Sequence, residues 1–407
     1  AIPIDQHGKN LRRSMQQNDA RASQQIEELK QRLEDYPVLQ KTGAPITQQS
    51  IAPKLMWLMQ NEPALWESTT KIVGSYDLMA YWLTGEFSIE SNWAVESGLL
   101  DWESGTWNQD ILNAAGISAE LLPDPRQPHE IIGWVTEEAS KSTGLQTGTP
   151  VVAGTADHVA SAFATGLIDE GDLTVKLGGA GDILMVTNKP VIDPRLYFDY
   201  HLIPNKYLPN GCMAASGSLI RWFQAQIGCQ TSLKTLDKEA EKAGPGAGGI
   251  VMLPYFLGEK TPINDPAARG AFIGLHLGHE RGHLFRAVLE GISFGFRHHL
   301  EIMNSLGFYP QKVRVTNGGA NSKLWTQVTA DILNLTLEKV KVSGGSALGV
   351  AFVAGMGMQA FDSWHSIEQY IEIERIIKPR PDKQYETNFE TYKNLYPALK
   401  YLAKESM

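Results

Sequence analysis

The chain has 407 residues, of which 43% are hydrophobic and 20% are charged, and its formal net charge at pH 7 is −9. This length suits two domains better than a single core, and the composition is that of a folded chain. The acidic balance argues against a nucleic-acid-binding surface, so we expect no nucleic-acid partner.

The two cysteines, Cys212 and Cys229, form neither a C-x-x-C pair nor a group with histidines. This usage is typical of two ordinary thiols in a reducing compartment. We assign no metal ligands. No apolar run reaches the ~18 residues that a membrane span needs, and no signal peptide opens the chain. We therefore expect a cytoplasmic protein without a membrane partner.

The first part of the chain has mainly helical patterns. Residues 1–4 predict the end of a buried strand, so we expect the chain to begin within a domain. Residues 9–35 are polar and predict a solvated helix with weak apolar spacing. Two further helices are predicted at 51–60, with a proline in the first turn, and at 75–84, ended by Gly85.

Short β segments follow from about residue 150. Residues 151–154 predict a buried strand, and Asp157 lies just past its end, before a helix of small residues. A turn at 169–172 then precedes a second strand–loop–strand unit. We place the domain boundary at this turn, which gives domains at 1–168 and 169–407.

The second domain alternates strands, glycine-rich loops and helices. Strands are predicted at 173–177, 183–186 and 313–316, and helices at 281–305 and 345–358. This alternation predicts an α/β fold.

Three glycine-rich segments, at 178–181, 318–319 and 344–345, lie next to these strands. Glycine lets backbone N–H groups approach phosphate oxygens, and a following helix N-terminus favours an anion. One such loop alone is more often a plain tight turn, but three in one domain indicate a nucleotide. None is a Walker loop or a complete dinucleotide-binding fingerprint.

Asp157 is the best candidate for catalysis. A carboxylate at the carboxyl end of a strand, before a helix of small residues, points into a cleft. Phosphoryl transfer needs positioning, charge neutralisation and a carboxylate that takes the hydroxyl proton. From the local sequence alone, the alternative that Asp157 merely caps the helix remains open.

The most specific pattern lies at 254–290. It reads Gly-Glu-Lys-Thr-Pro at 258–262, Arg-Gly-Ala-Phe-Ile-Gly-Leu at 269–275 and Leu-Phe-Arg-Ala-Val-Leu-Glu at 284–290. In this order the segments resemble the FGGY family of carbohydrate kinases, which couples a G-E-R-T-P-like segment, R-G-x-x-x-G-L and an L-x-x-A-x-x-E helix.

The resemblance covers almost the whole chain, and the pieces stand in the family's order. Further matches are P-K-L-x-W at 53–57, L-T-G at 83–85, G-x-x-D at 154–157, the second phosphate loop at 178–181, the adenosine segment beginning at 318 and A-L-G at 347–349.

The resemblance implies an actin-like ATPase fold, related to ribonuclease H, with two α/β domains and a cleft between them. It implies a sugar-binding domain at 1–168, incomplete at its start, and a nucleotide-binding domain at 169–407. The expected reaction is ATP-dependent phosphorylation of a ketose, above all a ketopentose, or of a polyol, with Mg²⁺ on the phosphates. A homodimer is common in the family.

The same resemblance implies roles for individual residues. Asp157 falls on the family's general base. The sugar-side residues are expected to be Asp5, Gln49 and His158, where His158 stands in place of a frequent Asn or Gln. The nucleotide-binding residues are expected to be Gly178, Gly179, Ala180, Gly181, Gly318, Gly319, Ala320 and Asn321.

The sequence also departs from the family. It contains no D-x-G-T phosphate hairpin, which usually lies in a further segment of roughly 80 residues, so we expect these 407 residues alone to transfer phosphate poorly or not at all. The loop at Gly179 and Ala180 lacks the usual hydroxyl. Asp182 could hold Mg²⁺, but an aspartate turn is the favoured interpretation. His158 could instead cap its helix.

These departures keep a second hypothesis open. A non-catalytic relative of the fold could bind nucleotide as a regulator or scaffold, and a hydrolase of the same fold is a remote third. Asp157 and the sugar-side segments favour the kinase.

Overall fold

A six-stranded mixed sheet organises the second half of the chain. The computed structural model describes residues 1–16, 19–341 and 344–404. The strand order is β11-β10-β9-β14-β15-β16. Neighbours are antiparallel in the β11-β10-β9 meander and at β15-β16, and parallel at β9-β14 and β14-β15. The strands span Asp172–Leu177 (β9), Gly181–Met185 (β10), Asn210–Met213 (β11), Lys312–Thr316 (β14), Leu337–Val340 (β15) and Ile373–Ile377 (β16).

Helices cover both faces of this sheet, and the alternation of side chains along β10 explains why. Ile183 and Met185 belong to the large core that includes α12 (Arg281–Ser305), whereas Leu184 packs with α9 (Asp157–Phe163) and α14 (Gly345–Gly357). Successive strand residues point to opposite faces. The central strand β9 is consequently buried along all six residues.

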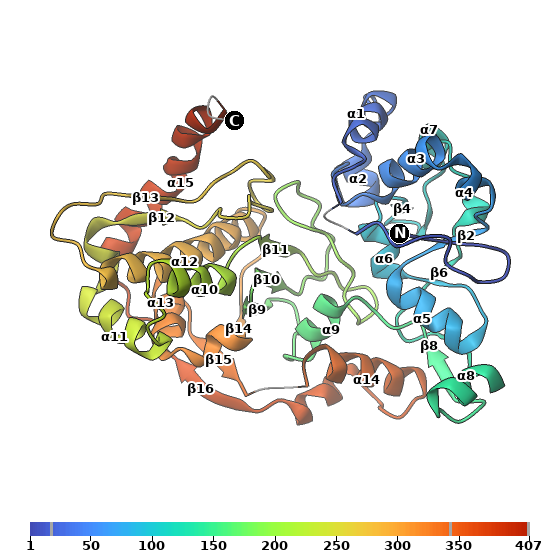
Figure 1. Ribbon diagram of the computed structural model, residues 1–407. Coiled ribbons are helices and arrows are strands. Elements are labelled where there is room, and N and C mark those ends of the chain that lie inside the picture. Colours follow the sequence, from blue (N-terminus) through green and yellow to red (C-terminus); the bar gives the residue numbers. More distant parts are fainter. Residues whose placement is uncertain (17–18, 342–343, 405–407) are drawn as a thin grey trace.

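The first part of the chain forms a separate lobe, at the right of Figure 1 in blue to cyan. It contains short two-stranded sheets, such as β1 (Ile2–Ile4) paired with β2 (Lys71–Val73), and small helices around two hydrophobic clusters. All three residues of β1 are buried, which confirms the predicted strand. The remaining short strands are β3 (Ile89–Glu90), β4 (Leu100–Asp101), β5 (Thr106–Trp107), β6 (Pro125–Arg126), β7 (Ile131–Trp134), β8 (Pro150–Val152), β12 (Val251–Leu253) and β13 (Ala271–Ile273).

Most predicted helices are confirmed within one or two residues at each end. The other helices are α1 (Ser23–Arg32), α2 (Val38–Thr42), α3 (Ile51–Asn61), α4 (Pro63–Glu67), α5 (Ser75–Thr84), α6 (Ser91–Glu96), α7 (Gln109–Ala115), α8 (Glu137–Thr143), α10 (Gly217–Gln226), α11 (Leu233–Ala243), α13 (Lys323–Leu333) and α15 (Lys383–Lys404). Short 3₁₀ segments lie at Ala119–Leu121 (η1), Pro245–Gly249 (η2), Gly318–Asn321 (η3) and Trp364–Tyr370 (η4).

Two predicted elements were wrong in extent or burial. The helix expected at 9–35 is helical only over α1, because the preceding residues pair with β1: Leu11 N–H donates to Pro3 O and Met15 N–H to Ala1 O. Residues 17–18 of that prediction lie outside the described residues. The strand expected at 151–154 is β8, which is only half-buried because it pairs with β7 in a two-stranded sheet away from the central one.

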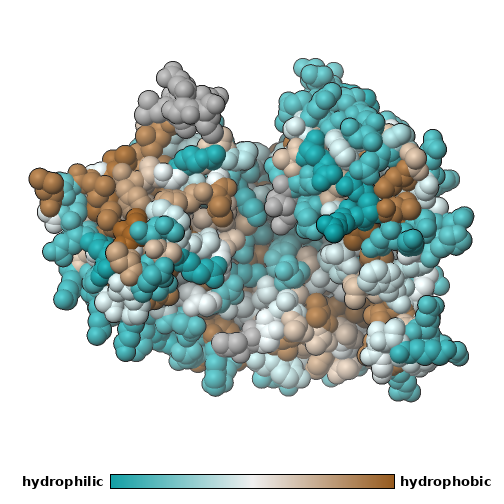
Figure 2. All heavy atoms as spheres, viewed as in Figure 1, coloured by the Kyte–Doolittle hydropathy of each residue, from teal (hydrophilic) through white to brown (hydrophobic). Residues whose placement is uncertain are grey.

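A long connection from the second lobe reaches across to the first. We call residues 186–209, between β10 and β11, the bridging segment. Its Phe198 lies in a hydrophobic cluster of the first lobe. Tyr200 N–H donates to Asn92 Oδ1 at 2.8 Å, and Tyr200 Oη donates to Trp102 O at 2.5 Å. Figure 2 shows a hollow between the two lobes. None of the described helices is long and apolar enough to cross a membrane.

Candidate active site

Asp157 is the first residue of α9, at the junction of the two lobes (Figure 1). Gly154 has a φ of +81° and turns the chain between β8 and the helix, a conformation that favours glycine. The N-cap position is Ala156, and no side chain caps the helix there. The cap alternative for Asp157 is therefore wrong. Its side chain is 93% exposed, so the carboxylate is accessible to an acceptor molecule.

His158 lies between carboxylates on both edges of its ring. Its Nδ1 is 3.9 Å from Asp157 Oδ1, its Nε2 is 3.2 Å from Asp199 Oδ2, and the same Nε2 is 3.6 Å from Glu96 Oε1. Asp199 is buried and comes from the bridging segment, whereas Glu96 ends α6 in the first lobe. We call Glu96, Asp157, His158 and Asp199 the carboxylate–imidazole cluster. It joins residues that lie more than 100 positions apart in the sequence.

The charges in this cluster shift one another's pKa values. Burial alone would lower the pKa of His158, but the carboxylates of Asp199, Asp157 and Glu96 raise it well above its usual range. The interaction with His158 in turn lowers the pKa of Asp157. Burial and the neighbouring carboxylates raise the pKa of Glu96 to about 8, although the charge of His158 acts in the opposite direction. At neutral pH the cluster thus pairs an imidazolium with an ionised Asp157.

Lys176 contacts the backbone of the helix that carries Asp157 and His158. It is buried in β9, and its ammonium donates to His158 O at 2.9 Å and to Ser161 Oγ at 2.6 Å. Burial lowers the pKa of Lys176, and the nearby carboxylates of Asp182 and Asp157 oppose that shift. Asp182 pairs across the sheet with Lys176, so the aspartate turn expected for it was wrong and it lies within strand β10.

The other two residues predicted on the sugar side, Gln49 and Asp5, have different contacts. The side chain of Gln49 interacts with the hydroxyl of Tyr197, which stands two residues before Asp199 on the bridging segment. Asp5 accepts hydrogen bonds from its own turn, from His7 N at 2.8 Å and Lys9 N at 2.9 Å. Within the described part of the chain, Asp5 is not brought into the carboxylate–imidazole cluster.

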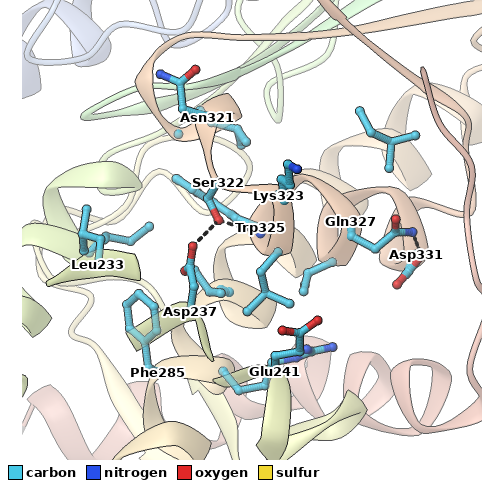
Figure 3. Close-up of a pocket in the computed structure, with 18 of the residues that line it drawn as sticks. Leu233, Asp237, Glu241, Phe285, Asn321, Ser322, Lys323, Trp325, Gln327 and Asp331 are labelled. Carbon is cyan, nitrogen blue, oxygen red and sulfur yellow. Dashed lines mark hydrogen bonds between the residues drawn. The ribbon is translucent and has the colours of Figure 1, made fainter. Parts of the chain in front are cut away.

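A cavity of about 1910 Å³ opens in the second lobe between α11, α13 and the glycine-rich turns. Figure 3 shows side chains from α11 and α13 facing one another across it. Five of the eight expected nucleotide residues line it: Gly178, Gly179, Gly318, Gly319 and Asn321. The other three, Ala180, Gly181 and Ala320, are not among its lining residues, and Gly181 and Ala320 are buried.

Backbone contacts shape the end of this cavity at the turn after β9. The turn after β9 is fixed to the start of α10, because Gly178 O accepts from Gly217 N at 2.7 Å and Gly179 O accepts from Ser216 N at 2.9 Å. A side chain on Gly217 would meet Gly178 O at 2.6 Å. Only glycine therefore lets the start of α10 approach the turn so closely.

Polar side chains line the other end. Ser322 Oγ donates to Asp237 Oδ2 at 2.8 Å, and Gln327 Nε2 donates to Asp331 Oδ1 at 2.7 Å (Figure 3). The cavity has more basic than acidic residues in its lining, which suits a polyphosphate. The basic ones are Arg221, Lys234, Lys238, Arg286, Lys323, Arg375, Lys378 and Arg380, and the acidic ones Asp237, Glu241, Asp331 and Asp382.

The third glycine-rich segment lies elsewhere. Gly344 and Gly345 are not among the cavity's lining residues, and Gly345 begins α14. In that helix a side chain on Gly349 would meet Ala160 O at 2.2 Å. The small residues of α14 thus let it pack closely on α9, the helix that carries Asp157.

One group among the described residues has metal-ligand geometry, since one atom each of Glu96, His158 and Asp199 lies within 4.8 Å of the others. Mg²⁺ prefers oxygen ligands in octahedral geometry. The central atom of this group is a histidine nitrogen that faces two carboxylates as a donor, so the group does not fit a resident Mg²⁺.

Sequence reasoning missed Glu96, Asp199 and Lys176. Glu96 stands in an ordinary helical pattern, and Asp199 in a connection without a recognisable motif. Lys176 had a usable signal, because a lysine inside the strand pattern at 173–177 requires a buried partner.

The mixed sheet, the hollow between two lobes and the glycine-lined cavity define a nucleotide-binding protein of the actin-like ATPase fold. Residues 1–164 match the N-terminal domain, and residues 175–358 the C-terminal domain, of the FGGY family of carbohydrate kinases.

Individual proteins agree with this match. The crystal structure of xylulose kinase from Rhodospirillum rubrum is similar with a TM-score of 0.93 and 38% identity, covering 99% of this chain and 83% of that one. Xylulose kinase of Lactococcus lactis is 31% identical over 97% of this chain and 80% of its own length. Gluconate kinase from Lactobacillus acidophilus has a TM-score of 0.93 and 25% identity, covering 100% of this chain and 83% of that one.

The chain belongs to the FGGY family of carbohydrate kinases. The predicted fold class is confirmed, and so is the predicted enzyme class: the protein phosphorylates a sugar hydroxyl with ATP.

Proposed function

We propose that the protein phosphorylates a neutral ketopentose, with xylulose as the first substrate to test, and that Asp157 is the general base. The observation that carries the proposal is an exposed carboxylate whose pKa is lowered by an adjacent imidazolium. Such a group is ionised at neutral pH and can take the proton of a sugar hydroxyl as that oxygen attacks the γ-phosphorus of ATP.

In this proposal residues 1–168 bind the sugar and residues 169–407 bind ATP, which enters as its magnesium complex. Backbone N–H groups near Gly178 and Gly179 bind phosphate, and the segment 318–321 binds the nucleoside. The support for this division is the cavity between α11 and α13, with its surplus of basic residues. The metal shields phosphate charge, while the chain's own groups position the acceptor and take its proton.

The cluster's charges favour a neutral acceptor over a sugar acid. A sugar acid would bring a carboxylate into a site whose exposed group is the ionised Asp157. The cations nearby are already engaged, His158 with Asp199 and Lys176 with His158 O and Ser161. The chain is similar to both xylulose and gluconate kinases, so the similarity alone does not distinguish a neutral sugar from a sugar acid as the substrate. The residues around the acceptor do, because like charges in a cleft disfavour binding.

A coupled ADP-release assay of the full-length protein tests the proposal. With xylulose, ribulose, glycerol and gluconate as acceptors, we expect the highest kcat/KM for a ketopentose and the lowest for gluconate. His158→Asn, which keeps a donor but removes the cation, serves as the matched variant, and we expect it to widen the preference against gluconate, because the cluster becomes more negative. ATP binding without any sugar-stimulated turnover would contradict the proposal.

We also propose a cytoplasmic location and a homodimer. The dimer is proposed from the family resemblance, and the exposed Leu257, Leu275 and Leu277, at 70%, 55% and 107%, are candidate contacts for it. Size-exclusion chromatography with light scattering tests the dimer. A monomer at micromolar concentration would contradict it.

A further inference from the structure

The two ring nitrogens of His158 each face a carboxylate, at different distances. A neutral imidazole has one N–H donor and one acceptor nitrogen, whereas an imidazolium has two donors. Here Nδ1 faces Asp157 at 3.9 Å and Nε2 faces Asp199 at 3.2 Å. An ionised carboxylate can accept hydrogen bonds but cannot donate them. Nε2 is within hydrogen-bond distance of Asp199, whereas Nδ1 is too far from Asp157 for a hydrogen bond. Opposite charges within about 4–6 Å favour the charged form of a titratable group, so the two carboxylates together favour the cationic ring.

The two flanking carboxylates have different surroundings. The side chain of Asp157 is 93% exposed, whereas that of Asp199 is 2% exposed. Asp199 reaches the ring from the bridging segment, whose Phe198 and Tyr200 anchor it to the first lobe. The buried carboxylate is thus the fixed partner of the ring, and the exposed one is the partner that meets the acceptor.

We propose that Asp199 is a positioning residue for phosphoryl transfer: it holds His158 as an imidazolium beside Asp157, so that the base stays directed toward the acceptor. No proton moves between Asp199 and His158 in this arrangement. The only proton transfer is from the acceptor hydroxyl to Asp157. The inference rests on the proposed role of Asp157.

Four charged groups face the ring, and their effects differ. Asp157 lies on α9 itself, Glu96 on α6, Asp199 on the bridging segment and Lys176 on β9. The three carboxylates favour the cation. Lys176 opposes it, but its ammonium is directed at His158 O and Ser161 Oγ. With Asp199 neutral, burial would prevail and the pKa of His158 would fall.

The direct test is NMR of the histidine Cε1–H groups, with the His158 resonance assigned by its loss in His158→Asn. In the wild-type protein we expect this resonance to stay at the imidazolium position between about pH 6 and pH 8, where an ordinary histidine titrates. In Asp199→Asn we expect it to titrate within or below that range. A wild-type His158 that titrates like an ordinary histidine would overturn the inference, even if Asp199→Asn fails to fold.

Kinetics give a second readout that a merely structural role would not move. In Asp199→Asn we expect kcat to fall roughly tenfold or more at pH 7.5. As the pH is lowered toward 6, His158 regains its proton, so the ratio of variant to wild-type kcat should rise while the KM for ATP stays unchanged. A ratio that is flat with pH would contradict the positioning role.

Two further variants serve as controls. Asp193→Asn changes another carboxylate of the bridging segment, which is paired with Arg195 at 2.6 Å, and should leave the His158 resonance unchanged. Glu96→Gln should leave His158 protonated, because Asp199 remains. If the His158 resonance in Glu96→Gln titrated in the same pH range as in Asp199→Asn, the assignment of this role to Asp199 would be wrong. The NMR measurement needs no turnover, so it tests the role of Asp199 separately from the kinase assay. Either proposal can therefore be contradicted while the other is supported.

Discussion

The proposed acceptor side and the proposed nucleotide side of this kinase differ in what forms them, side chains in the first and backbone in the second. The nucleotide cavity is shaped by backbone turns and close glycine contacts within continuous strand–turn–helix units. The carboxylate–imidazole cluster consists of side chains from α6, α9 and the bridging segment. A site made of backbone is specified locally, whereas a site made of side chains depends on the whole tertiary structure. Substitutions should therefore act differently on the two sides.

The largest effect is expected on the acceptor side. Asp157→Asn keeps the shape of the side chain but removes the base, so we expect kcat for the ketopentose to fall roughly a thousandfold. Because Asp157 is 93% exposed and does not cap α9, the melting temperature should change little. The measurement is sugar-dependent ADP release together with thermal unfolding.

Binding of ATP provides the control for this variant. The affinity for ATP, followed by calorimetry, should match that of the wild type, since Asp157 does not line the nucleotide cavity. A kcat within threefold of the wild-type value would show that another group takes the proton.

The next effect tests the backbone character of the nucleotide side. In Gly319→Ala the new methyl would lie 2.2 Å from Trp325 Cζ3 and 2.7 Å from Leu177 Cβ, so a large buried ring must move. We expect a loss of about 1–3 kcal/mol in unfolding free energy. The KM for ATP should rise roughly tenfold, while the KM for the sugar is retained.

Gly318→Ala is the matched control, because the neighbouring position has no atom within 4 Å of an added Cβ. Its unfolding free energy should stay within about 0.5 kcal/mol of the wild type. If both alanines destabilise the protein equally, close packing at Gly319 is not what requires glycine there.

The same contrast explains which parts could be predicted from the sequence. The helices α3, α5 and α12 were predictable, because apolar periodicity and their end signals lie within each segment. Glycine beside a strand marks a close backbone approach, and Gly178 and Gly319, singled out on this ground, both line the cavity of the second lobe; that they bind nucleotide stays a prediction. Ala180 was included with them by its position in the loop, but its place outside the lining depends on how the turn folds back on α10.

The rest depends on contacts between distant segments. Asp199 has meaning only because the bridging segment docks on the first lobe, and docking of Phe198 among side chains of that lobe leaves no periodic signal. For the same reason residues 9–35 were misread: pairing of Leu11 with Pro3 replaces the helix that a polar composition allowed. Weakly amphipathic segments are decided by tertiary partners rather than by propensity.

The smallest expected effect lies where the nucleotide side does use a side chain. Ser322 caps α13 by accepting from Trp325 N at 3.0 Å, and its hydroxyl donates to Asp237. Ser322→Ala should cost about 1 kcal/mol of unfolding free energy and raise the KM for ATP two- to threefold, roughly the effect of one lost neutral hydrogen bond. Thr136→Ala, which removes the N-cap of α8 in the first lobe, should cost similar stability without changing the KM for ATP. If Ser322→Ala also left that KM unchanged, the hydroxyl would stabilise the helix alone, and the nucleotide side would depend on backbone even more completely than the comparison with the acceptor side suggests.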